Sequence, residues 1–334
     1  MSVKIGIIGL GNIIDSHLQA MHKIDEIKIN CVCDKNPERL EDIANKLGCK
    51  GYDDYGKLLQ ENLDVILIAL PHGLHCRVAI DALKAGCHVM VEKPMAVSVD
   101  ECNQMLATAK AFNKHIIVTE AASYNPGVIK TGNKFKNGTL GRFFTGSIIN
   151  IRNYFHKGRP AWFLDPEMSG GGMFSNIGLH RLAVARGCLP GLTPSSVSAS
   201  VSYMPQYQVE ACTAAIVKYE QGGAMLYEEV GYYPKPGWMN SITHFIYEEG
   251  IVNWDNRYWR MIDKNGVEWE EALPYEENPY IGIYYNMLDA LRGEEYYPTA
   301  YEYAMDIAIV QAAYASSAQG KEIYLNSPQW TIER

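Results

Sequence analysis

The sequence has no run of basic residues and no apolar stretch near the roughly 18 consecutive residues that crossing a bilayer requires. Acidic side chains outnumber basic ones by 38 to 30, which gives a formal net charge of -8 at pH 7. A surface of that sign repels phosphate backbones. We therefore expect neither a membrane protein nor a partner of nucleic acid.

The first residues, MSVKIGII, lack the basic start and the cleavage site of a secretory signal peptide. The eight cysteines include no C-x-x-C pair, and their spacing offers no structural zinc site. Reduced and mostly buried thiols are typical of this pattern. We expect a cytoplasmic protein without a metal.

The sequence also has no internal repeat and no low-complexity segment. Of its 334 residues, 47% are hydrophobic and 20% are charged, which is the profile of a soluble globular protein. The length exceeds what one compact core usually supports. We expect two domains, at residues 1–122 and 123–334, with the C-terminal helices able to pack back on the first domain.

Short apolar strands alternate with helical segments in the first domain. The strand at residues 65–69 is apolar throughout, which fits burial on both faces of a parallel sheet. Alternation at this spacing predicts right-handed crossovers and a doubly wound parallel sheet. The predicted strands cover residues 3–9, 27–34, 65–69, 88–91 and 116–119, and the predicted helices cover residues 12–24, 37–47, 53–60, 77–85 and 99–112.

The pattern changes after about residue 124, where longer β-like runs are linked by polar turns. These runs predict an α+β domain with a large, mostly antiparallel open sheet. Many of the 22 tyrosines lie in this half, and an open sheet with Tyr and Trp on its outer face often packs against another subunit. We expect a homodimer or homotetramer formed through this sheet. The predicted strands cover residues 143–151, 196–203, 211–219, 224–232 and 243–247, and the predicted helices cover residues 127–137, 282–292 and 300–317.

Residues 9–14, GLGNII, follow the first predicted strand and open the first predicted helix. Gly9 permits a tight turn, and Gly11 lets the backbone approach a pyrophosphate at the helix N-terminus. Ile14 stands where a dinucleotide fingerprint has its third glycine, so we expect the helix to stand slightly off the sheet. The candidate cofactor contacts in this loop are Gly9, Gly11, Asn12 and Ile13.

Asp34 ends the second predicted strand about twenty residues further on, where an acid hydrogen-bonds the ribose hydroxyls of the adenosine. Its carboxylate also repels a 2′-phosphate, which favours NAD over NADP. Lys35 can bind a phosphate through its ammonium group, which weakens the preference for NAD. The alternative is that Asp34 is only the N-cap of the helix that begins near Pro37.

Two further segments make the pattern specific: residues 69–75, ALPHGLH, and residues 86–94, GCHVMVEKP. Together they resemble the P-N-x-x-H and G-K-H-V-x-x-E-K-P segments of the glucose–fructose oxidoreductase and inositol dehydrogenase family, Gfo/Idh/MocA. This family resemblance implies an N-terminal Rossmann domain, a C-terminal α+β domain and an NAD(P)-dependent dehydrogenase or reductase acting on CH–OH groups. It extends over essentially the whole chain, through residues 124–126 (YNP), 138–142 (GTLGR), Trp162, residues 170–172 (GGG) and His180.

The resemblance implies roles for the residues of the E-K-P segment. Glu92 and Pro94 shape the loop near the nicotinamide, with a cis peptide bond before Pro94. Lys93 points at the oxygen of the reacting carbon, where an ammonium can hydrogen-bond a hydroxyl or polarise a carbonyl while hydride moves. The alternative is a surface lysine between a strand and a loop.

Leu70, Pro71 and three histidines complete the first domain's candidates. Leu70 and Pro71 lie in the segment that the resemblance assigns to cofactor contacts. His72 stands where the family often has Asn, close to the nicotinamide ribose. His75 matches a histidine of the family, with a structural role as the alternative, and His17 is expected to be structural. The spacing of His72 and His75 alone would allow a metal, but no third ligand is evident.

His180 lies four residues after Asn176, which puts both on one face of a helix that starts after the glycine run. By the resemblance, His180 takes the hydroxyl proton as hydride leaves, a task suited to a group that titrates near neutral pH. The family usually has Asp where this chain has Asn176. Asparagine keeps the hydrogen bonding without the charge, so we expect a less basic His180 or an Asn176 that mainly holds a substrate hydroxyl. A structural His180 is the alternative.

By the resemblance, the segment before the glycine run lines the substrate cavity, together with Tyr124. Aromatic faces stack on sugar rings, and Arg or His reads hydroxyls or a carboxylate. Packing is the alternative role of Trp162 and Phe163. The candidates of this segment are Arg152, Tyr154, His156, Arg159, Trp162 and Phe163. The same substrate is expected to contact Lys93, Asn176 and His180.

The resemblance implies a sugar, a cyclitol or a related polyol as the substrate, with the direction of the reaction open. One alternative is a glycosidase that uses NAD transiently without net redox change. Accumulation of free NADH while a glycosidic bond survives distinguishes a dehydrogenase from it. The other alternative is a non-catalytic NAD-binding sensor, against which Lys93 and His180 argue, although Asn176 leaves it open.

Overall fold

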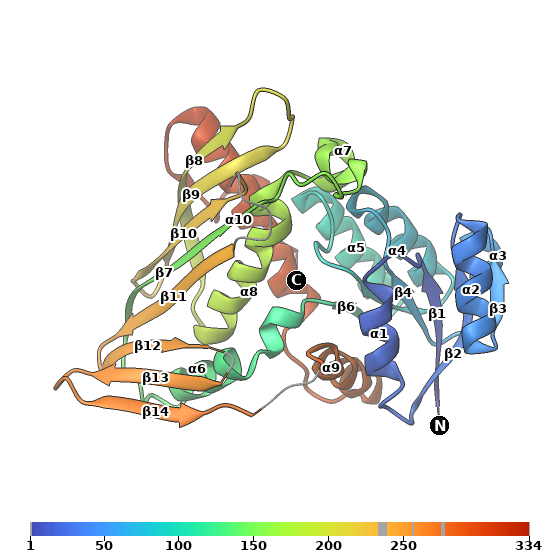
Figure 1. Ribbon diagram of the computed structural model, residues 1–334, viewed down its shortest axis with the longest axis horizontal. Helices are drawn as coiled ribbons and strands as arrows, with labels where there is room; N and C mark the ends of the chain where they lie inside the picture. Colours follow the sequence, from blue (N-terminus) through green and yellow to red (C-terminus); the bar gives the residue numbers. More distant parts are fainter. Residues whose placement is uncertain (1, 233–238, 256, 275–277, 334) are drawn as a thin grey trace. The chain divides into compact units, whose positions relative to one another are not determined.

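A computed structural model describes residues 2–232, 239–255, 257–274 and 278–333 (Figure 1). The chain divides into two compact units. Unit 1 contains Met1–Ala121, Asn278–Ala304 and Ile332–Arg334, and unit 2 contains Ala122–Glu277 and Met305–Thr331. Residues 278–304 therefore belong to unit 1, although they follow the sheet of unit 2 in the sequence.

Unit 1 is built on a parallel sheet whose order, within the described residues, is β3-β2-β1-β4-β5-β6. The order reverses between β1 and β4, and ligands of open α/β sheets bind at the carboxyl ends of the strands beside such a reversal. The sheet confirms the predicted doubly wound fold. Its strands are β1 (Val3–Ile8), β2 (Ile27–Cys33), β3 (Lys50–Tyr52), β4 (Val65–Ile68), β5 (His88–Val91) and β6 (Ile116–Val118).

The helices of unit 1 follow from local sequence. The helix α2 begins at Pro37 because the Asn36 side chain accepts the N–H of Arg39, and it ends at Gly48, whose φ is 61°. All four residues of β4 are buried, as expected of a strand in the middle of a parallel sheet. The α-helices are α1 (Ile14–Met21), α2 (Pro37–Leu47), α3 (Tyr55–Leu58), α4 (His75–Lys84), α5 (Val99–Ala111) and α9 (Tyr280–Arg292), and a 3-10 turn, η1 (His72–Leu74), precedes α4.

Unit 2 is built on a large sheet whose order, in the part of the chain that the structure describes, is β14-β13-β12-β11-β7-β10-β9-β8-β15. Its pairs are antiparallel except β7 with β10, so the predicted mostly antiparallel sheet is confirmed. The strands are β7 (Phe143–Arg152), β8 (Pro194–Tyr203), β9 (Glu210–Tyr219), β10 (Ala224–Val230), β11 (Met239–Tyr247), β12 (Gly250–Trp254), β13 (Tyr258–Asp263), β14 (Glu268–Ala272) and β15 (Ile323–Tyr324).

Two helices of unit 2, α6 (Pro126–Lys136) and α8 (Leu179–Cys188), lie together on one face of the large sheet (Figure 1). Their contacts with the strands are specific: the Tyr247 hydroxyl donates to the carbonyl oxygen of Cys188, and the indole N–H of Trp259 donates to the hydroxyl of Thr131. The chain's long last helix, α10 (Ala300–Gln319), begins in unit 1 and continues in unit 2. We call the face toward α6 and α8 the inner face.

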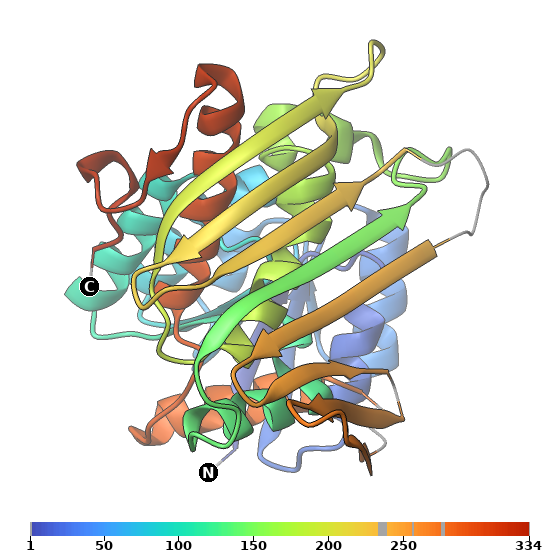
Figure 2. The ribbon, with the colours of Figure 1, turned by 90° about the vertical axis from the view of Figure 1, so that its left-hand side faces the viewer.

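Figure 2 looks onto the outer face of the large sheet, in front of which no helix of unit 2 is drawn within the described residues. The pairing places five aliphatic residues on this face, and each is between 40% and 46% exposed. Of the aromatic side chains of this sheet, Tyr219, Tyr227, Tyr247 and Trp259 are buried, whereas Tyr258 on the outer face is 37% exposed. The aliphatic residues are Ile216, Leu226, Ile242, Ile251 and Ile262.

The predicted elements agree with the structure best where the apolar pattern is strong. The helix at residues 37–47 and the strand at residues 88–91 have the predicted bounds. The predicted helix at residues 53–60 is shortened to Tyr55–Leu58. The prediction missed β3 and β15, which have three and two residues, and also β12 and β13. It missed β14 as well, whose sequence EWEEA is exposed throughout and shows no apolar alternation.

No helix in the described ranges combines the length and the apolar character that spanning a membrane demands. All eight cysteines are free thiols, and six of them are buried; Cys49 and Cys212 are half-buried. The expectation of mostly buried thiols is confirmed.

Candidate functional site

The turn after β1 has the form that a dinucleotide needs. Gly9 has a φ of 94°, and a Cβ there would lie 2.2 Å from the carbonyl oxygen of Ala69, so the position requires glycine. A Cβ on Gly11, by contrast, would meet no atom within 4 Å. Ile14, in the place of the third glycine, is completely buried. The turn thus has open space beside its backbone at the start of α1, where helix N–H groups can receive a pyrophosphate.

Asp34 connects the end of β2 to this turn. Its Oδ2 accepts a hydrogen bond of 2.7 Å from the N–H of Leu10, and its Oδ1 accepts one of 2.7 Å from the N–H of Asn36. The N-cap of α2 is Asn36, so the alternative interpretation of Asp34 as that cap is wrong. Asp34 is held at the carboxyl edge of the sheet, where its oxygens can accept further hydrogen bonds from ribose hydroxyls.

Arg39 belongs to the same turn, although the sequence pattern does not reveal it. Its Nε donates to the carbonyl oxygen of Leu10 at 2.8 Å, and its Nη2 lies 3.4 Å from Oδ1 of Asp15. A guanidinium on α2 therefore stands beside the turn that Asp34 holds. Only the pairing of β1 with β2 brings this position there, so no spacing within the sequence could have indicated it.

His75 holds together the loops that follow β4 and β5. Its Nδ1 lies 2.8 Å from the carbonyl oxygen of Pro94, and its Nε2 lies 2.8 Å from that of Leu70. Burial lowers the pKa of His75 below its ordinary value, and the two carbonyls offset part of that effect. These contacts support the structural role. His72 follows Pro71 in the same loop; it is buried too, with its ring centroid 5.7 Å from that of His75.

Glu92 is fixed by a network that the sequence did not reveal. Its Oε1 lies 2.9 Å from Nε2 of His17 and accepts a hydrogen bond of 2.7 Å from the hydroxyl of Thr119. The other ring nitrogen of His17 lies 2.8 Å from the hydroxyl of Tyr284, on α9. Burial alone raises the pKa of Glu92, but His17, Thr119 and the charge of Lys93 outweigh it and hold that pKa below its ordinary value. These contacts support the expected structural role of His17.

Lys93 comes directly after β5, with a half-buried side chain between the buried Glu92 and Pro94. The Lys93–Pro94 peptide bond is cis, as predicted. The network around Glu92 and the bond from His75 to Pro94 fix the backbone on both sides of Lys93. Unit 1 therefore presents one ammonium group at the carboxyl end of β5, the edge at which this class of sheet binds ligands.

In unit 2, the glycine run is held by Glu210, the first residue of β9. Its carboxylate accepts the N–H of Gly172 at 2.5 Å, that of Phe174 at 2.8 Å and that of Ser175 at 3.3 Å. Burial raises the pKa of Glu210 above its ordinary value, and the N–H groups of Gly172 and Ser175 offset part of the rise. A Cβ on Gly172 would lie 2.2 Å from the carbonyl oxygen of Glu210, so the run approaches β9 as only glycine allows.

The segment after the glycine run begins as a π-helix, Phe174–Gly178, and continues as α8. Asn176 lies in the π-helical turn, 3% exposed, and its Nδ2 donates to the hydroxyl oxygen of Tyr154 at 3.3 Å. His180 is the second residue of α8 and is half-buried. The predicted helix is confirmed, but its first turn is wider than the α-helix on which the four-residue spacing was based. Turns of this kind often occur at functional sites.

Tyr154 is completely buried, so the expectation that it lines an open cavity is wrong. It packs with Met173 and Ile177 of the segment that carries Asn176. The Arg159 guanidinium lies 3.7 Å from the centroid of the Tyr154 ring, and its Nε donates to the Tyr154 carbonyl oxygen. Tyr154 therefore orients Asn176 and is in turn held by Arg159.

Arg152, the last residue of β7, belongs to a polar cluster on the inner face of the large sheet. Nδ2 of Asn150 donates to Glu229 at 2.6 Å, and Arg152 and Arg181 both act on the charge of the same carboxyl. Burial raises the pKa of Glu229 to about 7, an effect that Asn150, Arg181 and Arg152 partly offset. We call Asn150, Arg152, Arg181 and Glu229 the inner polar cluster.

The remaining candidates of unit 2 lie in short turns. Tyr124 ends a 3-10 turn, η2 (Ala121–Tyr124), and is half-buried. His156 is exposed. Trp162 lies in another 3-10 turn, η3 (Ala161–Leu164), with its ring stacked on that of Phe163 at a centroid distance of 3.7 Å, which favours the packing role. The short helix α7 (Pro166–Ser169) follows and ends at Gly170.

A parallel sheet with this glycine turn and an acid at the end of β2 is typical of a dinucleotide-binding Rossmann domain. The chain belongs to the Gfo/Idh/MocA family. Residues 3–120 match the family's NAD-binding Rossmann domain, and residues 132–242 match the family's C-terminal domain.

The chain is similar to two curated relatives over part of its length. It is 27% identical over 247 residues to 1-carboxy-3-chloro-3,4-dihydroxycyclohexa-1,5-diene dehydrogenase of Comamonas testosteroni, covering 72% of this chain and 62% of that protein. It is 29% identical over 188 residues to D-glucoside 3-dehydrogenase of Escherichia coli K12, covering 55% and 53%. The matches thus span somewhat more than half the length of these relatives.

A solved structure of levoglucosan dehydrogenase in complex with NADH and levoglucosan has the same fold, with a TM-score of 0.87. The match covers 98% of this chain and 100% of that one, at 18% identity. At that identity the likeness bears on the fold alone.

Proposed function

We propose that this protein is an NAD-dependent dehydrogenase or reductase of a sugar, a cyclitol or a related polyol. The observation that carries the proposal is Lys93, fixed at the carboxyl end of β5 in a dinucleotide-binding sheet. The named activities of the relatives, which oxidise a glucoside and a cyclic diol, support the substrate class.

The residues of unit 1 fit NAD. The open space at Gly11 gives the pyrophosphate its approach to the start of α1, and Asp34 offers acceptors for the ribose. Bound NAD supplies the hydride acceptor for a C–H bond. The other candidate contacts of the cofactor are Gly9, Asn12, Ile13, Lys35, Leu70, Pro71, His72, His75, Glu92, Lys93 and Pro94.

In this proposal, Lys93 and His180 act on one substrate hydroxyl. As the C–H hydride leaves, the O–H bond breaks, its proton goes to the imidazole of His180, and the carbon becomes a carbonyl. The Lys93 ammonium stabilises the negative charge that develops on the oxygen. Asn176, oriented by Tyr154, holds a neighbouring hydroxyl. Tyr124, Arg152, His156 and Trp162 are the remaining candidates for substrate contact.

The proposed function is tested by the absorbance of NADH at 340 nm. The purified chain is mixed with NAD or NADP and a panel of sugars, inositols and their keto forms. A signal with one class of substrate supports the dehydrogenase and shows the preferred cofactor. NAD binding without any redox signal, combined with cleavage of chromogenic glycosides, would instead support the alternative of a glycosidase with transient redox.

Replacing Asp34 is expected to shift the preference between the two cofactors. In Asp34→Asn the side chain can still accept the N–H of Leu10 but no longer repels a 2′-phosphate, so the ratio of kcat/KM for NADP to that for NAD rises roughly tenfold or more. The control is Glu41→Gln, an exposed change of the same charge on α2. An unchanged ratio in Asp34→Asn would mean that Asp34 does not meet the ribose.

Replacing Asn176 by Asp is expected to move the pH dependence of oxidation. A carboxylate at position 176 that approaches the His180 ring favours the imidazolium, so the pKa of His180 rises. Because the protonated ring cannot accept a proton, the acid limb of kcat against pH moves to higher pH by the same amount. Asn133→Asp, an exposed change on α6, is the control. Profiles that coincide in wild type and Asn176→Asp would remove Asn176 from contact with His180.

We also propose that the outer face of the large sheet is an interface between copies of this chain, giving a homodimer or a homotetramer. The five aliphatic residues that share this face support the proposal, because exposed apolar patches of this kind usually mark interaction sites. Sedimentation of the wild type and of Leu226→Lys tests it: a smaller species in the variant is expected.

A further inference from the structure

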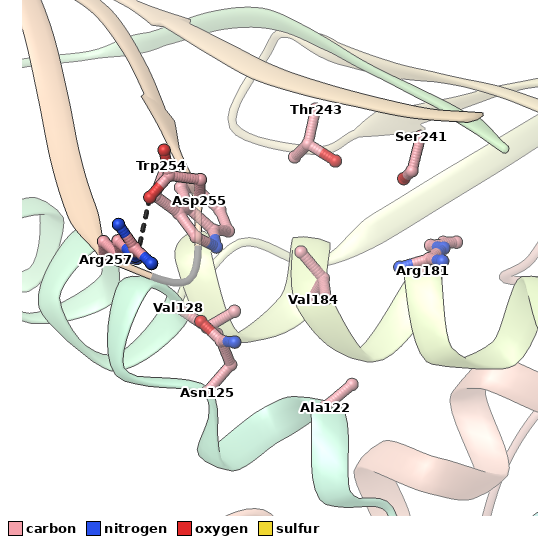
Figure 3. A pocket seen from close by; sticks show the side chains of 10 residues that line it. All are labelled: Ala122, Asn125, Val128, Arg181, Val184, Ser241, Thr243, Trp254, Asp255 and Arg257. Carbon is pink, nitrogen blue, oxygen red and sulfur yellow. Dashed lines mark hydrogen bonds between the residues drawn. The ribbon is translucent and has the colours of Figure 1, made fainter. Parts of the chain in front are cut away.

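Unit 2 contains a cavity of about 550 Å³ that the proposed hydride transfer does not use. It lies between the start of α6, the middle of α8 and the strands β11 and β12 (Figure 3). Small-molecule sites typically enclose roughly 300–1,000 Å³, so the size fits a small metabolite. The lining that the structure describes includes none of the residues assigned above to the reaction.

The ends of the cavity carry charge. Arg181 lies at one end and Arg257 with Asp255 at the other, as Figure 3 shows. The carboxylate of Asp255 accepts the N–H groups of Arg257 and Tyr258 at 2.7 Å and 2.8 Å and pairs with Arg260 at 2.9 Å. These bonds lower the pKa of Asp255 to about 2, so it stays ionised. The charged groups of the lining therefore sum to one positive charge, which favours a monoanion.

Arg181 is the cation best placed to take that anion. Its side chain lines the cavity, while its buried Nε has no hydrogen-bond partner among the residues that the structure describes. Arg152 and Arg181 both act on the charge of Glu229, the one carboxyl of the inner polar cluster. Burial lowers the pKa of Arg152, and the charge of Arg181 lowers it further. Two guanidinium groups thus face one carboxyl, which leaves positive charge for a ligand. A guanidinium binds a carboxylate through paired N–H donors.

The walls between the two ends offer hydrogen bonds suited to hydroxyl groups. Ser241 and Thr243 lie on the inner face of β11, because they pair with Asn150 and Ile148, which point to that face. Figure 3 shows their side chains on the wall opposite Asn125. Oδ1 of Asn125 accepts the N–H of Gly127 at 2.9 Å, which orients the side chain so that its amide NH2 is the group offered to a ligand. These groups can donate to and accept from a polyol.

Trp254 gives the cavity one rigid aromatic wall. Its ring stacks on that of Phe245, with centroids 5.8 Å apart and planes 11° apart. On α6, a Cβ on Gly127 would lie 2.3 Å from the Trp254 ring, so only glycine lets the two elements approach this closely. An indole held in this way provides an apolar face for the C–H groups of a ligand without further loss of side-chain freedom.

We propose that this cavity is a second binding site, for a small hydroxylated monoanion of the sugar-acid class, with its carboxylate on Arg181 and its hydroxyl groups on Ser241, Thr243 and Asn125. The site does not depend on the proposed hydride transfer, since it shares no residue with it. A ligand there would contact α8, the helix that carries His180.

Isothermal titration calorimetry tests the site, with the full chain saturated with NADH so that the probe is not oxidised. Gluconate is the probe, glucose its neutral counterpart and acetate an anion without hydroxyl groups. We expect gluconate to bind at least tenfold more tightly than either. Arg181→Met should weaken gluconate binding at least tenfold, since a hydrogen bond to a charged group contributes about 1.5–3 kcal/mol. Arg142→Met, an exposed change in the same unit, should leave it unchanged.

Thr243→Val provides a second test that does not depend on how well Arg181→Met folds. Loss of one hydroxyl should weaken gluconate about fivefold and leave acetate unchanged. Equal gluconate affinity in wild type, Arg181→Met and Thr243→Val, or no binding at all, would overturn the proposal. So would binding that disappears in His180→Ala, because the probe would then occupy the reaction site. Turnover measured at 340 nm is a separate readout, so a failure of this site and a failure of the proposed function can be told apart.

Discussion

Lys93→Met is expected to reduce turnover by about 10²–10³-fold while leaving the affinity for NAD unchanged. Methionine keeps the length and the apolar stem of lysine, so the packing between Glu92 and Pro94 is preserved and only the ammonium is lost. Removal of a single preorganised group that stabilises a developing oxyanion typically has an effect of this size. The dissociation constant of NADH, from its fluorescence, and kcat, from absorbance at 340 nm, separate the two quantities.

The matched control is Lys84→Met, an exposed lysine in the last turn of α4, which should keep full turnover. Because Lys93 also contributes to the low pKa of Glu92, the thermal midpoint of each variant should be recorded as well. Turnover near the wild-type value in a folded Lys93→Met would remove this residue from the mechanism, and with it the observation on which the proposed function depends.

Glu210→Gln is expected to lower both the stability of the protein and its kcat. The glutamine oxygen can still accept the N–H groups of Phe174 and Ser175, but its NH2 group would face the N–H of Gly172. A buried donor left without a partner costs about 1–3 kcal/mol. Because these N–H groups begin the segment that carries Asn176 and His180, we expect kcat to fall at least tenfold, while the affinity for NAD, which resides in unit 1, stays the same.

Glu228→Gln is the control, since Glu228 is an exposed neighbour on β10. The measurements are chemical unfolding and steady-state kinetics well below the thermal midpoint. A role as positioning residue requires that kcat fall in protein that is still folded. A Glu210→Gln variant that is less stable but turns over at the wild-type rate would show that Glu210 supports the fold alone.

Much of unit 1 could be predicted from the sequence because its strands and helix ends are specified by residues close to one another in the chain. A buried parallel strand is apolar along its whole length, and the ends of α2 are set by Asn36, Pro37 and Gly48. The short or polar elements were harder. The strand β14 is recognisable only by its pairing with β13, and the π-helical turn at Asn176 depends on Glu210, which lies 34 residues away in the sequence.

The candidate site divides in the same way. The residue types at Gly9, Gly11, Asp34 and Lys93 could be assigned because a turn, an acid after a strand and the E-K-P segment are readable in order along the chain. The partners that hold them could not. His17 reaches Glu92 across 75 positions, and Arg39 reaches the glycine turn only through the pairing of two strands.

The sequence by itself determined the fold class, the family and which residue types are available for cofactor binding and proton transfer, because these follow from periodicity and short spacings. Only the tertiary structure decided which side chains are buried and which are fixed by hydrogen bonds to other residues. It moved Tyr154 from an expected cavity lining into the core beneath Asn176, placed aliphatic residues on the outer face of the large sheet, and formed the cavity at Arg181 from segments far apart in the chain. The physical reason is that burial and hydrogen-bond partnership depend on contacts between distant residues, which sequence order does not contain.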